Sequence, residues 1–107
     1  MVMGIPYKLV YAPQVKQHLK AIESKYFSLI RTKIETQLKL DPTVETRNRK
    51  PLKQRADFEG EWELRFGPGN QFRVFYAIDI ENHEVQILAI GVKKGNRLFI
   101  GGEEVEL

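Results

Sequence analysis

The sequence predicts an α+β fold, in which an N-terminal strand and an antiparallel helical hairpin pack on a twisted antiparallel β-sheet. Two segments before residue 42 repeat apolar residues at helical spacing. After residue 61 the apolar residues recur at every second position, as in strands. Short turn segments separate these strands, and strands joined by short turns pair antiparallel. With 107 residues, we expect a single domain over 1–107, because a second core would leave each half marginal.

The first half of the chain is expected to contain one strand and two helices. Residues 5–11 are rich in β-branched and aromatic side chains, which favour a strand. A helix should begin at Ala12-Pro13, because proline is tolerated in a first turn, and a break near 24–25 should end it. The second helix should stop at Asp41-Pro42, because the residue before a proline disfavours the helical conformation. The expected apolar stripes are Val15, Leu19 and Ile22 on the first helix, and Phe27, Ile30, Ile34 and Leu38 on the second.

The second half is expected to contain four strands. They should cover 61–66, 72–78, 85–90 and 97–100, with turns at 67–70, 79–84 and 94–96. The segment 85–90 is almost wholly apolar, as in a strand that is covered on both faces. Trp62 should face the helices and belong to the core.

Composition excludes several classes of protein. The chain has no cysteine, and therefore no disulfide, thiol nucleophile or thiolate metal site. No apolar run approaches the ~18 residues of a membrane span. The first residues lack the pattern of a secretion signal, so we expect a cytoplasmic protein without membrane association.

The formal net charge of +3 is less informative than its distribution. The segment 47–55 has no acidic residue, and its basic residues are Arg47, Arg49, Lys50, Lys53 and Arg55. Acidic side chains follow directly, at Asp57, Glu59, Glu61 and Glu63. The basic run has three interpretations: a solvated loop, a segment that binds nucleic-acid phosphates, or a docking surface for an acidic protein.

The strands on either side of residues 67–70 give a testable register. Apolar side chains must share one face of a hairpin, which pairs Leu64 with Phe72 and Trp62 with Val74. The same register pairs Glu63 with Arg73 and Arg65 with Gln71 on the opposite face. This face is expected to carry either a cross-strand ion pair or a cationic surface that holds a phosphodiester.

Three motifs carry a resemblance to a known family. They are Trp62-Glu63-Leu64-Arg65, then Phe72-Arg73-Val74-Phe75-Tyr76, then Leu88-Ala89-Ile90-Gly91-Val92-Lys93-Lys94. In this order, with the preceding helices, they resemble the RelE/ParE superfamily of toxins from bacterial type II toxin–antitoxin modules. The segments 44–51 and 95–104 resemble a RelE-like branch, and the resemblance covers essentially the whole chain.

The resemblance implies a chemistry and a set of residues. RelE cleaves mRNA in the ribosomal A site without a metal, through attack of the 2′-OH on the adjacent phosphate. That reaction needs a base, cations for the developing charge, and an acid for the leaving oxygen. Arg73, Arg65 and Lys93 match cationic positions of RelE, and Glu63 replaces a lysine and becomes the candidate base.

Further positions are expected to contact nucleic acid. Phe99 stands where RelE has a tyrosine, Lys94 takes the place of Lys93 if the alignment shifts by one residue, and Arg97 is a further phosphate contact, so these residues join the basic run as expected contacts. Phe75 shares the face of Arg73 and either stacks on a base or covers the sheet. The two histidines are weaker candidates for the acid: His18 lies beside a helical apolar stripe, and His83 lies in a turn.

Three functional hypotheses follow from the resemblance. The first is a ribosome-dependent mRNA endonuclease without cofactor or metal. The second is a ParE-type toxin that poisons DNA gyrase and does not cut RNA. The third is a non-catalytic protein that binds its antitoxin and acts with it as a co-repressor on operator DNA. All three imply a cognate antitoxin protein as partner, with operator DNA bound only through that complex.

Overall fold

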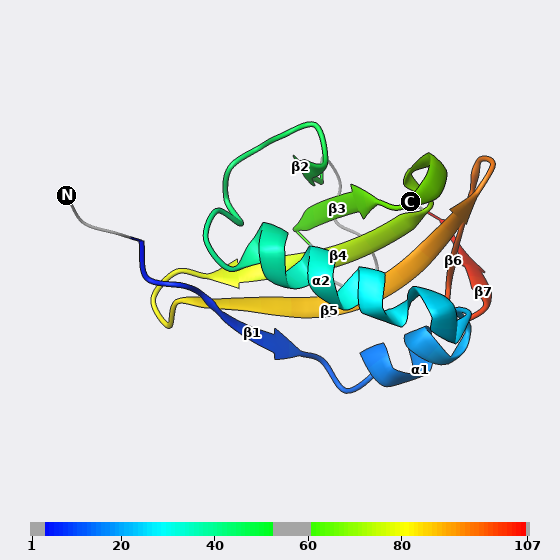
Figure 1. The fold of residues 1–107 in the computed structure, drawn as a ribbon, viewed down its shortest axis with the longest axis horizontal. Coiled ribbons are helices and arrows are strands. Elements are labelled where there is room, and N and C mark those ends of the chain that lie inside the picture. Colours follow the sequence, from blue (N-terminus) through cyan, green and yellow to red (C-terminus); the bar gives the residue numbers. More distant parts are fainter. Residues whose placement is uncertain (1–3, 53–60, 107) are drawn as a thin grey trace.

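The computed structural model describes residues 4–52 and 61–106. The elements follow the predicted order of a strand, a helical hairpin and a sheet (Figure 1). The helical elements are α1 (Val15–Lys20), the 3₁₀ turn η1 (Ser24–Tyr26), α2 (Phe27–Leu38) and the 3₁₀ turn η2 (Pro68–Asn70). The strands are β1 (Lys8–Tyr11), β2 (Arg49–Pro51), β3 (Trp62–Phe66), β4 (Phe72–Asp79), β5 (Glu84–Lys94), β6 (Arg97–Ile100) and β7 (Glu103–Val105).

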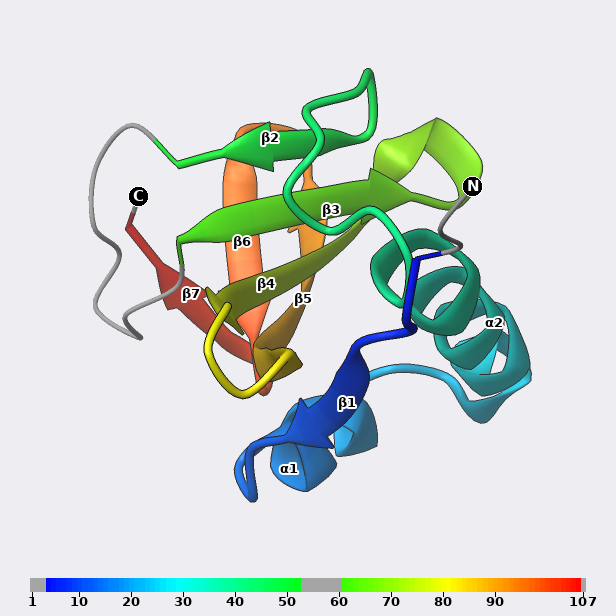
Figure 2. The same ribbon diagram turned by 90° about the vertical axis from the view of Figure 1, so that its left-hand side faces the viewer.

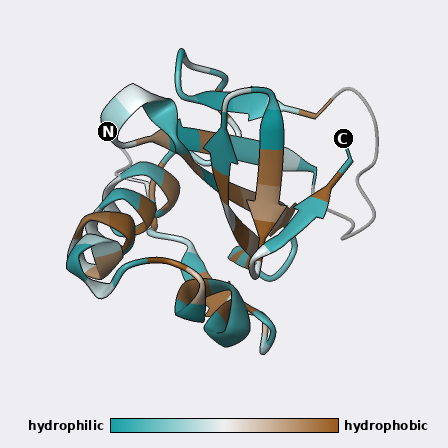
Figure 3. Cartoon of the chain, turned by 90° about the vertical axis from the view of Figure 1, so that its right-hand side faces the viewer, coloured by the Kyte–Doolittle hydropathy of each residue, from teal (hydrophilic) through white to brown (hydrophobic). Residues whose placement is uncertain are grey.

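The two helices occur where they were predicted, and both are shorter. Ile30, Ile34 and Leu38 are at most 2% exposed, which confirms the buried face of α2. Phe27, the first residue of α2, is 38% exposed, but it lines one hollow with Ile30 and Ile34 and therefore shares their face. Both helices show alternating apolar and polar stretches (Figure 3).

The sheet has the order β2-β3-β4-β5-β6-β7, and all these neighbours pair antiparallel, as predicted. β1 differs, because it pairs with β5 in parallel. The chain between β1 and β5 contains the helices, and such a crossover permits parallel pairing. Figure 2 shows β1 and both helices below and beside the sheet, whereas β6 and β7 curl behind it.

One edge of β5 is shared between two strands. β1 pairs with Glu84–Ile87, and β6 pairs with Gly91–Lys94. Side chains of the α1 region fill the interval between them: Gln14 Nε2 donates to the Leu88 carbonyl at 3.3 Å, and the Ile90 N–H donates to His18 Nδ1 at 3.2 Å. Burial lowers the pKa of His18, which favours the neutral imidazole that this bond requires.

The predicted register between β3 and β4 is wrong by two residues. Phe66 pairs with Phe72, Arg65 with Arg73 and Glu63 with Phe75. The connection is longer than expected because Pro68–Asn70 form a 3₁₀ turn. Since the shift is even, each side chain still points to its predicted face.

Both faces of the sheet are covered. The main core lies under the helices, and Trp62 is only partly buried there, with its ring stacked 6.1 Å from that of Tyr76. A second, smaller core on the opposite face contains Phe75, Ala89 and Leu98. Phe75 is fully buried there, so it covers the sheet and cannot stack on a nucleobase. Neither β2, inside the basic run, nor β7, inside the acidic tail, was predicted.

Candidate nucleic-acid interface

The face of the sheet away from the helices brings the predicted catalytic residues together. Arg65 lies directly opposite Arg73 on β3 and β4, and Arg73 lies opposite Gly91 on β5. Lys93 is two residues beyond Gly91 and therefore shares this face. Together with Glu63, these residues form what we call the cationic face, whose three cations and one carboxylate leave a net positive charge.

Glu63 stands between the two arginines. Its side chain is 3% exposed, and its carboxylate accepts from Arg65 Nε at 2.5 Å and from Arg73 NH1 at 3.4 Å. Arg73 is held further by a bond from its Nε to the Asn70 carbonyl at 3.0 Å. The predicted pairing of Glu63 with Arg73 is thus present, although through a different register.

The two arginines differ in their access to a ligand. The Arg65 side chain is 42% exposed, whereas that of Arg73 is 8% exposed. Arg65 is therefore the more accessible of the two guanidinium groups. It also lines, with Lys50 and Glu63, a hollow of about 460 Å³ beside β2 and β3. A hollow of this size falls within the range of small-ligand sites.

The fold places the basic residues of segment 47–55 in different surroundings. Arg47 is exposed, and Lys50 lies beside the hollow with its Nζ 3.3 Å from the Glu45 carboxylate. Arg49 is only 8% exposed, and its guanidinium donates to the carbonyls of Val44 and Gln37 at 3.0 and 2.8 Å. In this structure the Arg49 guanidinium is turned away from solvent and connects β2 to the end of α2, which argues against the expected contact with nucleic acid. Lys53 and Arg55 lie outside the described residues.

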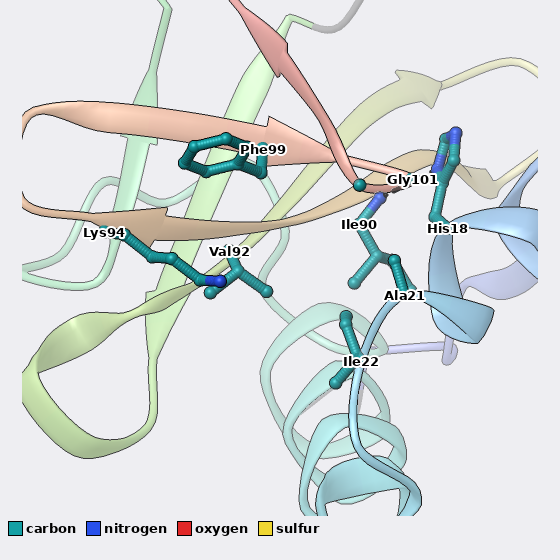
Figure 4. A pocket seen from close by; sticks show the side chains of 9 residues that line it. His18, Ala21, Ile22, Ile90, Val92, Lys94, Phe99 and Gly101 are labelled. Carbon is teal, nitrogen blue, oxygen red and sulfur yellow. Dashed lines mark hydrogen bonds between the residues drawn. The ribbon is translucent and has the colours of Figure 1, made fainter.

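Phe99 and Lys94 lie on the other face of the sheet, away from Arg73. Phe99 pairs with Val92, and the two line one cavity under α1 with Lys94 and His18 (Figure 4). The reason is the alternation of β6, where Leu98 enters the second core and the next side chain must point away. The structure therefore separates Phe99 from the residues with which it was expected to act.

Three other expected candidates lie at different places. Arg97 is exposed, with its Nε 3.9 Å from the Glu104 carboxylate, and it lines a hollow together with Lys93. His83 lies in the β4–β5 turn, where its ring stacks on Tyr7 and contacts the Ile5 carbonyl. His18 lines the cavity near Phe99, and the sequence signal for this was its place beside the apolar stripe of α1.

The described residues contain neither a candidate metal site nor a membrane-spanning helix. No group of three or more His, Cys, Asp or Glu side chains within 4–52 and 61–106 is arranged to hold a metal ion. Over the same residues, no helix has the length and apolar character needed to cross a membrane.

Comparison with known proteins places the chain among toxins. Residues 9–96 match the family model described as the ParE toxin of the type II toxin–antitoxin system, parDE. A similar solved structure is the toxin–antitoxin complex RelBE2 from Mycobacterium tuberculosis, with 22% identity and a TM-score of 0.67. The alignment covers 83% of this chain and 93% of the other, and at this identity it shows a shared fold. No curated protein matches the chain significantly.

Proposed function

The chain belongs to the ParE toxin family and is the toxin of a type II toxin–antitoxin module, and we propose that it acts as a ribosome-dependent mRNA endonuclease that needs no metal. The observation that carries this proposal is the cationic face, where Arg65 and Arg73 pair with one carboxylate and Lys93 lies on the same side of the sheet. Such a face suits a phosphodiester whose negative charge increases during the reaction.

The proposed reaction assigns one role to each group. The phosphate takes the place of Glu63 beside Arg65, and both arginines stabilise its developing charge. Glu63, released from Arg65, accepts the proton of the 2′-OH as this oxygen attacks phosphorus. The bond to the 5′ oxygen breaks, and the Lys93 ammonium gives that oxygen a proton. The products are a cyclic 2′,3′-phosphate and a 5′-OH end.

A second candidate is inhibition of DNA gyrase, as in ParE-type toxins. The matching family model favours it, as does the double pairing of Glu63, which keeps the carboxylate from acting as a free base. Both candidates place the protein in the cytoplasm with its antitoxin. In both, operator DNA is contacted only through the toxin–antitoxin complex.

Toeprinting of mRNA on ribosomes with the purified chain tests the first candidate. The wild-type chain should cut in the A site, and Arg65→Ala should reduce the cleavage rate by about 100-fold, as expected for loss of one charged donor. Arg31→Ala is the matched control, because Arg31 lies on α2 with an 80% exposed side chain paired to Glu35. Absence of cleavage together with inhibition of gyrase supercoiling would select the second candidate.

A further inference from the structure

The cavity between the α1 region and the β5–β6 hairpin lies on the side of the sheet that the helices cover, away from the cationic face. It has a volume of about 170 Å³ and is open to solvent. Its walls come from three separate elements (Figure 4). The lining residues are His18 of α1, Ala21 and Ile22 just after α1, Ile90, Val92 and Lys94 of β5, and Phe99, Gly101 and Gly102 around the end of β6.

The size of this cavity, which we call the Phe99 cavity, limits what it can hold. Drug-sized ligands occupy about 300–1,000 Å³. An engineered apolar cavity of about 150 Å³ in another protein binds a single benzene ring. The Phe99 cavity therefore fits one ring or one branched aliphatic side chain, and it is too small for a whole nucleotide.

The walls of the Phe99 cavity are mainly apolar, and Lys94 is the one cation among the lining residues. Ile22 and Ile90 are 8% and 1% exposed. His18 contributes no charge near neutral pH, because its Nδ1 accepts the Ile90 N–H and burial lowers its pKa. Lys94 Nζ lies 5.5 Å from the centroid of the Phe99 ring, and within the described part of the chain it has no ion pair.

One wall of the cavity is backbone without side chains. Gly101 and Gly102 have φ values of +64° and +84°, which side-chain-bearing residues rarely adopt. A Cβ at Gly101 would lie 3.5 Å from His18 Cδ2, and a Cβ at Gly102 would lie 3.8 Å from Ala21 Cβ, so side chains here would take up space beside the cavity. The site is thus formed before any ligand arrives, which lowers the entropic cost of binding.

We propose that the Phe99 cavity binds the antitoxin, by taking one aromatic or branched aliphatic anchor residue whose neighbouring carboxylate pairs with Lys94. An acidic partner is favoured by the net charge of +3 and by the Lys94 ammonium, which has no ion pair among the described residues. The inference rests on the chain being a toxin with an antitoxin. It does not depend on whether the toxin acts on mRNA or on gyrase.

Calorimetric titration with the product of the gene adjacent to that of this chain gives the first test. Ala21→Leu fills the cavity and should weaken binding by about 30-fold, as loss of a buried anchor does. Lys94→Glu should weaken binding by about tenfold, and less at high salt. Lys16→Glu is the control for charge, because Lys16 is exposed on α1 and does not line the cavity; it should change affinity less than threefold. Ala21→Leu and Lys94→Glu chains that bind as well as Lys16→Glu would overturn the proposal.

A second test uses the unmodified chain and does not depend on the folding of any variant. Phenylacetate, a ring with a carboxylate, should shift the amide NMR signals of Val92, Gly101 and Gly102, and uncharged benzyl alcohol should bind more weakly. An RNA hexanucleotide serves as the competing titrant. If the RNA shifts these signals and phenylacetate does not, the cavity binds a nucleobase and the proposal fails. Toeprinting reads the endonuclease activity separately, so failure of one proposal leaves the other standing.

Discussion

Protonation of His18 should loosen the junction between α1 and β5. The imidazole accepts the Ile90 N–H through Nδ1 in the only interval of that β5 edge that β1 and β6 leave unpaired within the described residues. Ile90 is 1% exposed, so water does not readily replace the lost acceptor. An imidazolium would carry a hydrogen on Nδ1 and direct it at another donor.

The size of the effect follows from the buried N–H. Leaving such a donor unsatisfied costs about 1–3 kcal/mol. For a domain of this size each kcal/mol lowers the melting temperature by about 4–8 °C. His18→Ala should therefore lower the melting temperature at pH 7.5 by about 4–24 °C. His18→Asn places a carbonyl oxygen near the position of Nδ1 and should retain most of the stability.

The pH dependence has a defined sign. Burial lowers the pKa of His18 in the folded chain, so the unfolded chain takes up the proton first as the pH falls. The stabilisation is complete above the unfolded pKa of about 6.5 and decreases as the pH falls below it toward the folded pKa. Urea unfolding at intervals between pH 7.5 and 5 measures this loss.

The control for the pH series is the other histidine. His83→Asn should keep the slope between pH 7.5 and 5 that His18 produces, whereas His18→Asn should remove it. Equal slopes for wild type and His18→Asn would refute the reasoning, since the acceptor at Nδ1 would then contribute nothing to folding.

Three further predictions concern stability. Glu63→Gln removes the carboxylate between two guanidinium groups and should reduce the free energy of unfolding by about 3 kcal/mol in urea titration; an unchanged midpoint would show that the pairs contribute little. Gly91→Ala would place a Cβ 2.8 Å from the Phe99 carbonyl oxygen, so it should cost about 1–3 kcal/mol by thermal unfolding and displace the Phe99 amide signal. Tyr76→Phe loses the buried bond from the hydroxyl to the Pro42 carbonyl at 2.8 Å and should cost about 1 kcal/mol by the same measurement, with no change in the far-ultraviolet spectrum.

Much of the fold could be predicted because it depends on local pattern. The change of period near residue 61 located β3, β4, β5 and β6, and the helical spacing located the buried face of α2. β2 and β7 were missed because each has only three residues, and most of these are charged. They are strands only through their pairing with β3 and β6, which no local pattern shows. The apolar pattern fixes which face of the sheet each side chain of β3 and β4 points to. It does not fix the exact register between the two strands, because that depends on the conformation of the turn.

The part of the candidate site that could be predicted is the face of the sheet on which each side chain lies, because alternation along a single strand determines it. Alternation placed Glu63, Arg65 and Arg73 on one face, and the structure agrees. The burial of Arg49 and the position of Phe99 depend on how distant segments close over the sheet. No local pattern shows that the carbonyls of α2 receive the Arg49 guanidinium, or that β6 turns Phe99 toward α1.

The parallel pairing of β1 with β5 also determines when the fold can be completed. The first residues of β5 follow the end of β1 by more than 70 positions, so β1 leaves the ribosome long before its partner exists. At synthesis rates of about 5–20 residues per second, that interval lasts roughly 4–15 s. Throughout it the β1 segment has no strand to pair with, and α1 has no β5 backbone to receive Gln14 and His18. The nascent chain thus becomes a folded toxin only when the last third of the sequence has been made, because β5 is the strand on which β1, β4, β6 and α1 all assemble.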